Sequence, residues 1–213
     1  MKTSDVLTLS ETSATPENVG GRGLWLGQMN GAGFPAADGI HITFWRLTVK
    51  IIVVHTVTYF IMGLLALAFL DYGTAFAEPV TREYMRQVND PIVALGPALQ
   101  FIRGVLFAAA FYPLRGILFG RRNGWLIMWL LLVSLGILST FGAAPGSVEG
   151  LLYTRMPIAL QISGWLEVML QALLLSVILF FWVNHPEKKW LAWALGIIFV
   201  LVVGFSILGF ALA

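Results

Sequence analysis

Six polar side chains lie within otherwise apolar stretches of this chain: His55, Tyr59, Gln100, Arg103, Glu167 and Gln171. In each stretch the two residues concerned are three or four positions apart, so on a helix they share one face. Glu, His and Tyr side chains can pass protons, and transporters bind their substrates at polar groups near the middle of the bilayer. The six residues are therefore our candidates for a substrate site or a proton relay.

Arg103 and Glu167 carry opposite charges at similar depths in their stretches. At a rise of 1.5 Å per residue, Arg103 lies roughly 18 Å below residue 91 and Glu167 roughly 15 Å below residue 157. A charged side chain in hydrocarbon costs about 2.5–3.5 kcal/mol, so we expect both to face the bundle interior and to meet directly or through Gln100, Gln171 or a water. Two interpretations stay open: a functional polar site, or a structural ion pair that fixes which helices face each other.

The elements that position these residues are five long apolar runs, at residues 47–70, 91–119, 125–142, 156–183 and 190–213. A helix needs roughly 20 apolar residues to cross a hydrocarbon core of about 30 Å. None of the runs shows the polar face that a helix on a soluble core would carry. The sequence predicts an all-α integral membrane protein, a bundle of five transmembrane helices.

The composition agrees with a membrane protein and excludes several other classes. The chain is 58% hydrophobic and 11% charged, whereas soluble domains carry about 25% charged residues. It has no cysteine, which excludes disulfides, thiolate catalysis and cysteine-based metal sites. The net charge of +2 is too small to indicate a nucleic-acid partner. The three histidines are spread along the chain, so we expect no metal and no cofactor, haem included.

The N-terminal part differs from the rest. Residues 1–23 are rich in Ser, Thr, Glu and Gly, lack the apolar core of a signal peptide, and are predicted to be a disordered tail. Residues 24–46 mix Trp and Phe with Gly and Pro. That composition fits a segment in the headgroup region, although a plain linker with a few anchoring aromatic residues fits as well.

The positive charges predict the orientation. With the N-terminus in the cytoplasm, the inner side would hold Lys2, Arg22, Arg46, Lys50, Arg115, Arg121, Arg122, Lys188 and Lys189. The outer side would then hold only Arg82, Arg86 and Arg155. Because cytoplasmic connections carry the excess of Lys and Arg, the predicted topology is multi-pass, with the N-terminus inside and the C-terminus outside.

The connections and proline positions give local predictions. Pro79 is expected to open a short amphipathic helix that continues to about Val88, and Gly146 or Ser147 to cap a brief helical turn. Pro97 and Pro113 should each interrupt the second predicted span, since proline removes a backbone hydrogen bond.

No catalytic motif is present, so we assign no catalytic residue and regard an enzyme as the less favoured class. The first hypothesis is a small transporter or channel-like protein, with the lipid bilayer and other copies of the chain as its expected partners. The second is a non-catalytic accessory or assembly subunit of a larger membrane complex. The third is a membrane enzyme that acts on a lipid-like substrate through Glu149, Tyr153, Arg155 or Glu167.

Overall fold

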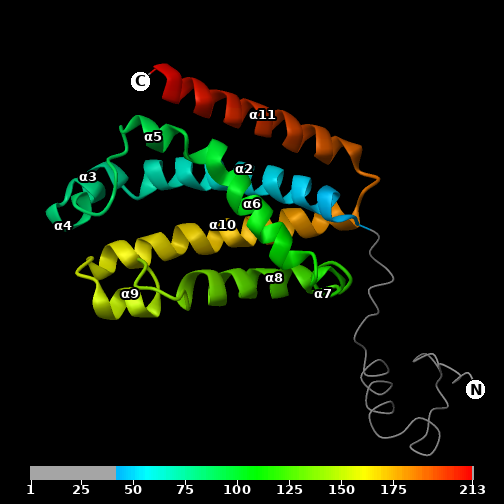
Figure 1. Ribbon diagram of the computed structural model, residues 1–213, viewed down its shortest axis with the longest axis horizontal. Coiled ribbons are helices and arrows are strands. Elements are labelled where there is room, and N and C mark those ends of the chain that lie inside the picture. Colours follow the sequence, from blue (N-terminus) through cyan, green and yellow to red (C-terminus); the bar gives the residue numbers. More distant parts are fainter. Residues whose placement is uncertain (1–41, 213) are drawn as a thin grey trace, which may run out of the picture.

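The structure, a computed structural model, describes residues 42–212 (Figure 1). The predicted tail at 1–23 and most of the predicted interfacial segment at 24–46 lie outside the described residues. From residue 42 to residue 212 the regular secondary structure is helical and contains no strand. The all-α prediction is confirmed for this part of the chain.

Three helices are long and apolar enough to cross a membrane among the described residues: α2 (Phe44–Phe69), α10 (Ile158–Asn184) and α11 (Lys189–Leu212). Their 26, 27 and 24 residues exceed the roughly 20 that a bilayer core requires. They coincide with the predicted runs at 47–70, 156–183 and 190–213. These three helices support a membrane protein.

The other two apolar runs form shorter helices. The run at 91–119 is divided into α5 (Pro91–Ala94), α6 (Gly96–Phe111) and α7 (Arg115–Leu118). The run at 125–142 forms α8 (Gly124–Val133), which continues as the π-helical segment η2 (Ser134–Leu138). Neither α6 nor the helix formed by α8 and η2 reaches the length of a candidate span, so the structure supports three of the five predicted spans by this criterion.

Proline accounts for the breaks on both sides of α6. Pro97 lies at the start of α6, and the chain between α5 and α6 turns at Leu95. Pro113 lies in the turn between α6 and α7. Because proline has no N–H and its ring clashes with the preceding turn, a helix is interrupted at each position, as predicted.

A side chain from α11 compensates for the first break. The Ser206 hydroxyl donates to the Ala94 carbonyl at 2.5 Å and lies 3.4 Å from the Ala98 amide, whose hydrogen it accepts. In a regular helix this amide and this carbonyl would bond each other. Ser206 bridges them, and in doing so it attaches α11 to the junction of α5 and α6.

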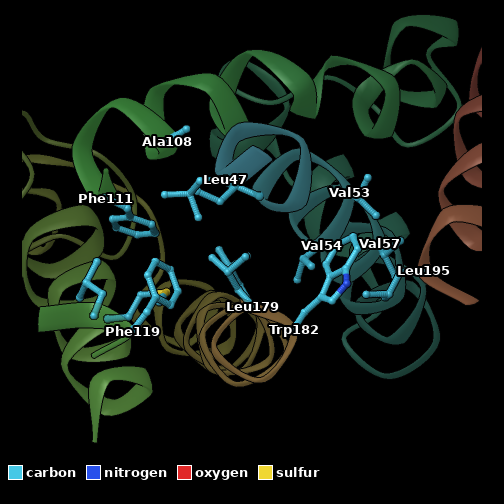
Figure 2. Packing of buried hydrophobic residues seen from close by; sticks show 14 residues of the cluster. Leu47, Val53, Val54, Val57, Ala108, Phe111, Phe119, Leu179, Trp182 and Leu195 are labelled. Carbon is cyan, nitrogen blue, oxygen red and sulfur yellow. The ribbon is translucent and has the colours of Figure 1, made fainter. Parts of the chain in front are cut away.

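The helices pack around α2. It contacts α6, α10 and α11, while α8 covers another side of α10 (Figure 1). The central turns of α2, from Val53 to Thr58, are buried without interruption. Figure 2 shows the apolar side chains of the core gathered where α2, α6, α7 and α10 meet, with Leu47, Phe111 and Leu179 among them. Since α2 is enclosed by other helices, polar groups on it can be satisfied by protein.

Gly104 allows α6 to approach α2 closely. A Cβ atom at this position would lie 2.6 Å from Cγ1 and 2.9 Å from Cα of Ile52. Contacts this short do not occur in real structures, so only glycine fits here. This close approach fixes the level of α6 on α2, and therefore places Gln100 and Arg103 beside the middle of α2.

Short helices form the connections at one end of the bundle. Here lie α3 (Tyr72–Ala77), α4 (Pro79–Arg82) and α9 (Val148–Tyr153), at the end of the bundle where α11 also ends (Figure 1). The predicted cap of α9 is confirmed, since the Ser147 hydroxyl accepts from the Gly150 amide at 2.9 Å.

The prediction of an amphipathic helix after Pro79 is correct only for the residue at which the helix begins. It begins at Pro79 but ends at Arg82 instead of extending to Val88. Side-chain contacts hold the following residues in an irregular path: Gln87 donates to the Phe76 carbonyl at 2.7 Å, and Arg86 pairs with Asp90 at 2.8 Å. Asp90 also caps α5 through the Ile92 amide, and the Arg86 side chain holds its pKa below the usual value.

Candidate functional site

A cavity of about 90 Å³ lies between the central helices. A water molecule needs about 10–15 Å³ of such space, so the cavity has room for several waters or one small solute. Ten residues from α2, α6, α8, η2 and α10 line it: His55, Arg103, Phe107, Leu132, Gly136, Ile137, Val168, Gln171, Ala172 and Leu175. Three of the six sequence candidates, His55, Arg103 and Gln171, therefore meet at one cavity.

His55 is buried on α2, and its hydrogen bond defines its tautomer. Its Nε2 lies 3.1 Å from Oε1 of Gln100, while the Gln100 amide nitrogen donates to the Gly96 carbonyl at 3.0 Å. Since the amide nitrogen is used on Gly96, Oε1 must accept, and Nε2 of His55 must carry the proton. Nδ1 of the neutral ring is then an acceptor, and it has no partner among the described residues.

Arg103 is exposed although it lies in the middle of α6. Its guanidinium carbon lies 5.8 Å from the centre of the Phe107 ring, and its charge reaches His55. Within residues 42–212 it forms no ion pair and no hydrogen bond. Arg103 thus forms one wall of the cavity and part of the molecular surface at the same time.

Glu167 is engaged elsewhere. Its carboxylate accepts a hydrogen bond from the Tyr72 hydroxyl on α3, and Glu167 does not line the cavity. Tyr59 lies within electrostatic range of both Glu167 and Arg103. The predicted direct pair of Arg103 and Glu167 is therefore not formed in the described structure, because a phenol donor from another element satisfies the carboxylate.

Gln171 is buried on α10, 8% exposed, and lines the cavity. Its side-chain amide forms no hydrogen bond with another described residue. Its amide atoms are not among the fully buried polar atoms that lack a partner, so the amide remains accessible although most of the residue is buried. Its donor and acceptor are available to whatever fills the cavity.

Tyr72 was missed by reasoning from the sequence. It lies just after the first apolar run, where a tyrosine is easily taken for a membrane-interface anchor. The backbone turns sharply at Asp71, which has a φ of 43° and whose carboxylate caps α3, and after this turn Tyr72 contacts Glu167 on α10. Burial, and then the hydrogen bond to Glu167, raise the pKa of Tyr72, so the phenol stays protonated and acts as a donor.

Part of the cavity wall is a π-helical segment. Gly136 and Ile137 belong to η2, in which the Ser139 amide bonds the Ser134 carbonyl at 3.0 Å across five residues. The Ser139 hydroxyl donates to the same carbonyl at 2.7 Å. A π-helical turn widens a helix and is frequent at functional sites. Gly136 adds no side chain, so the wall recedes here and leaves space.

Comparison with protein-family models, curated proteins and solved structures finds no match for this chain. What the fold and the site define is a class: a helical protein with three helices that could cross a membrane, and with a small, mostly apolar cavity that three polar side chains line.

Proposed function

We propose that the protein is a small transporter or channel-like membrane protein whose solute passes through the central cavity. The observation that carries the proposal is the convergence of His55, Arg103 and Gln171 on a cavity at the middle of α2. His55 is 11 residues from the start of α2, which is roughly 17 Å along a helix. Ionisable side chains at this depth are expensive in lipid, so they are rare, and they often mark pathways for ions or solutes.

We further propose that the chain crosses the bilayer five times, with the N-terminus inside and the C-terminus outside. Two segments support this, because each leads from one end of the bundle to the other: α5, α6 and α7 taken together, and α8 with η2 (Figure 1). Broken helices can cross a membrane where neighbouring helices satisfy their free backbone groups. Ser206 does this at the junction of α5 and α6.

Flux measurements in proteoliposomes test the transport proposal. The full chain is reconstituted, and movement of protons and of small solutes is followed with an internal pH dye and with isotope uptake. We expect flux above that of empty vesicles, and a loss of about tenfold or more with Arg103→Gln, because the variant lacks the charge at the cavity.

Arg86→Gln is the matched control, since it removes the same charge from a connection far from the cavity. Equal flux from protein-containing and empty vesicles across all solutes would refute the transport proposal. Equal losses from Arg103→Gln and Arg86→Gln would refute the role of the cavity.

One observation favours the second candidate, an accessory subunit of a membrane complex. Arg103 is exposed at a depth where lipid cannot satisfy it, and a carboxylate from a partner subunit or from a second copy of the chain would do so. Thiol crosslinking of the Arg103→Cys variant in native membranes tests the accessory-subunit hypothesis. A specific crosslinked species would support a partner at this face of the protein. The absence of such a species would remove this argument for an accessory subunit.

No contact supports the enzyme hypothesis. Glu149, Tyr153 and Arg155 are exposed on or next to α9, and none of the three makes a side-chain hydrogen bond with a described residue. A catalytic site needs converging groups that exclude water. The proposal therefore remains a transport protein, with the accessory subunit second.

A further inference from the structure

We propose that the central cavity binds a short-chain monocarboxylate, with the carboxylate on Arg103 and the hydrocarbon tail against the apolar wall. This deepens the proposed function by naming the substrate class of the same site. The binding claim itself needs only the cavity, so it can be tested apart from transport.

The first step is the charge. Arg103 has no acidic partner within residues 42–212, and Glu167, the acid at a similar depth, is bonded to Tyr72. In the proposed five-span arrangement the exposed Arg103 lies within the bilayer, where a guanidinium without a partner carries a large desolvation cost. A bound anion would remove that cost, so the unsatisfied charge selects a ligand of negative sign.

The second step is the shape of the polar groups. The guanidinium is planar and presents two parallel N–H groups, which match the two oxygens of a carboxylate better than a spherical ion. The free amide of Gln171 lies at the same cavity and supplies a further donor. Two independent groups without internal partners thus converge on one space, and both can donate to carboxylate oxygens.

The third step is the remainder of the lining, which is apolar. Phe107, Leu132, Ile137, Val168 and Leu175 surround the space away from the polar groups. These side chains offer no hydrogen bonds, so a fully hydrated inorganic ion would lose its water shell without compensation. A hydrocarbon tail gains from the same surface, since it leaves water on binding.

The fourth step is size. At about 10–15 Å³ for each water-sized group, a cavity of about 90 Å³ accommodates roughly six to nine non-hydrogen atoms. Propionate and butyrate fall within this limit, whereas octanoate exceeds it. The volume and the lining together therefore select a short aliphatic acid in its ionised form.

Thermal unfolding of the full-length protein in detergent micelles is the test, with propionate as the probe. Propionamide has the same shape without the charge, chloride has the charge without the shape, and octanoate exceeds the cavity. We expect millimolar propionate to raise the unfolding temperature in a saturable manner, and the three comparison solutes to leave it within the scatter of the untreated protein.

Variants locate the binding. Arg103→Gln should weaken the affinity for propionate by roughly tenfold or more, as expected for loss of a charge-assisted bidentate contact, whereas Arg86→Gln should not change it. Should Arg103→Gln fail to fold, Arg103→Lys serves instead, because it keeps the charge and removes the planar fork. That variant should bind propionate no better than chloride.

Each outcome of these measurements either supports or overturns the proposed binding site. No stabilisation by propionate, equal stabilisation by chloride, or an affinity unchanged in Arg103→Gln or Arg103→Lys overturns the proposal. Propionate binding without propionate flux in proteoliposomes keeps this site and refutes the transport function. Flux of another solute without propionate binding refutes this site and leaves the transport function in place.

Discussion

At the scale of single residues, polar side chains in this bundle form hydrogen bonds with backbone and charged groups that would otherwise lack a partner. Ser206 is the clearest case, because it reaches from α11 to two backbone groups that Pro97 leaves without their helical partners. Tyr72 acts similarly on the Glu167 carboxylate. Both hydrogen-bonding side chains come from elements distant in sequence, so each contact also connects two parts of the fold.

We expect Ser206→Ala to lower the free energy of unfolding by about 1–3 kcal/mol, because it leaves the Ala94 carbonyl and the Ala98 amide unsatisfied. Thermal or denaturant unfolding in micelles measures the change. Ser163→Ala is the matched control, since the Ser163 hydroxyl bonds only a carbonyl of its own helix, that of Leu160 at 2.9 Å. Equal effects from the two variants would contradict the bridging role.

Tyr72 gives a prediction for alkaline pH. Its pKa in the folded protein is raised by burial and by the Glu167 carboxylate, whereas in the unfolded chain a tyrosine titrates near pH 10. A raised folded pKa gives stability that is fully present below the unfolded pKa and is lost as the pH rises through the folded pKa. We therefore expect the unfolding temperature to fall above about pH 10, and to fall less in Tyr72→Phe.

Tyr84→Phe is the control for this measurement, since Tyr84 is 63% exposed and its phenol makes no hydrogen bond with a described residue. It should keep the alkaline loss of the unsubstituted protein. An alkaline profile that is identical in Tyr72→Phe and Tyr84→Phe would show that the Tyr72–Glu167 contact does not contribute.

At the scale of elements, the site depends on how α6 lies on α2. The contact of Gly104 with Ile52 sets the level of α6, and the hydrogen bond of Gln100 to His55 lies one turn away. The interruptions at Pro97 and Pro113 keep α6 short, so it can cross α2 obliquely instead of following its whole length (Figure 1). The short helix thereby brings Arg103 to the cavity.

Gly104→Ala should separate α6 from α2 and lower the free energy of unfolding by about 1–3 kcal/mol, the usual cost of inserting atoms into a close-packed contact. Gly63→Ala in α2 is the control, because a Cβ atom there meets nothing within 4 Å. Since alanine has the better helix propensity, the control should be neutral or slightly stabilising. A Gly104→Ala variant as stable as Gly63→Ala would contradict the close approach.

At the scale of the whole molecule, the arrangement has two chemically different ends. The connection 112–123 and the turn between α10 and α11 lie at the end with the start of α2, and they carry Arg115, Arg121, Arg122, Lys188 and Lys189 (Figure 1). The opposite end holds α3, α4 and α9. This separation of charge is the basis of the proposed orientation.

Single cysteines in this cysteine-free chain test the topology. We expect a membrane-impermeant thiol reagent applied to intact cells to label Glu149→Cys and not Asn123→Cys, because the first lies at the proposed outer end and the second at the inner end. Both positions are exposed, whereas Ser147 is buried as the cap of α9 and should not be replaced. The reverse labelling pattern would invert the orientation. Labelling of both positions from outside would contradict a crossing by α8 with η2, and would fit crossing by only the three long helices α2, α10 and α11.

The sequence by itself determined the class of the molecule and the positions of its long helices. The predicted runs at 47–70, 156–183 and 190–213 differ from α2, α10 and α11 by three residues or fewer at each end. Proline positions predicted the breaks around α6, and Ser147 predicted the cap of α9. These features are local: they depend on hydrophobic length, on the missing N–H of proline and on capping within a few residues.

Only the tertiary structure decided which polar groups meet. The depths of Arg103 and Glu167 along their helices allowed the two residues to pair. In the structure, the rotation of α6 turns Arg103 toward the cavity and the surface. The turn at Asp71 brings Tyr72 into contact with Glu167. The spacing of residues along a helix specifies neither how that helix is rotated against its neighbours nor which path a connection takes. Those follow from close packing at particular contacts such as Gly104 on Ile52, and they made His55, Arg103 and Gln171 a single site.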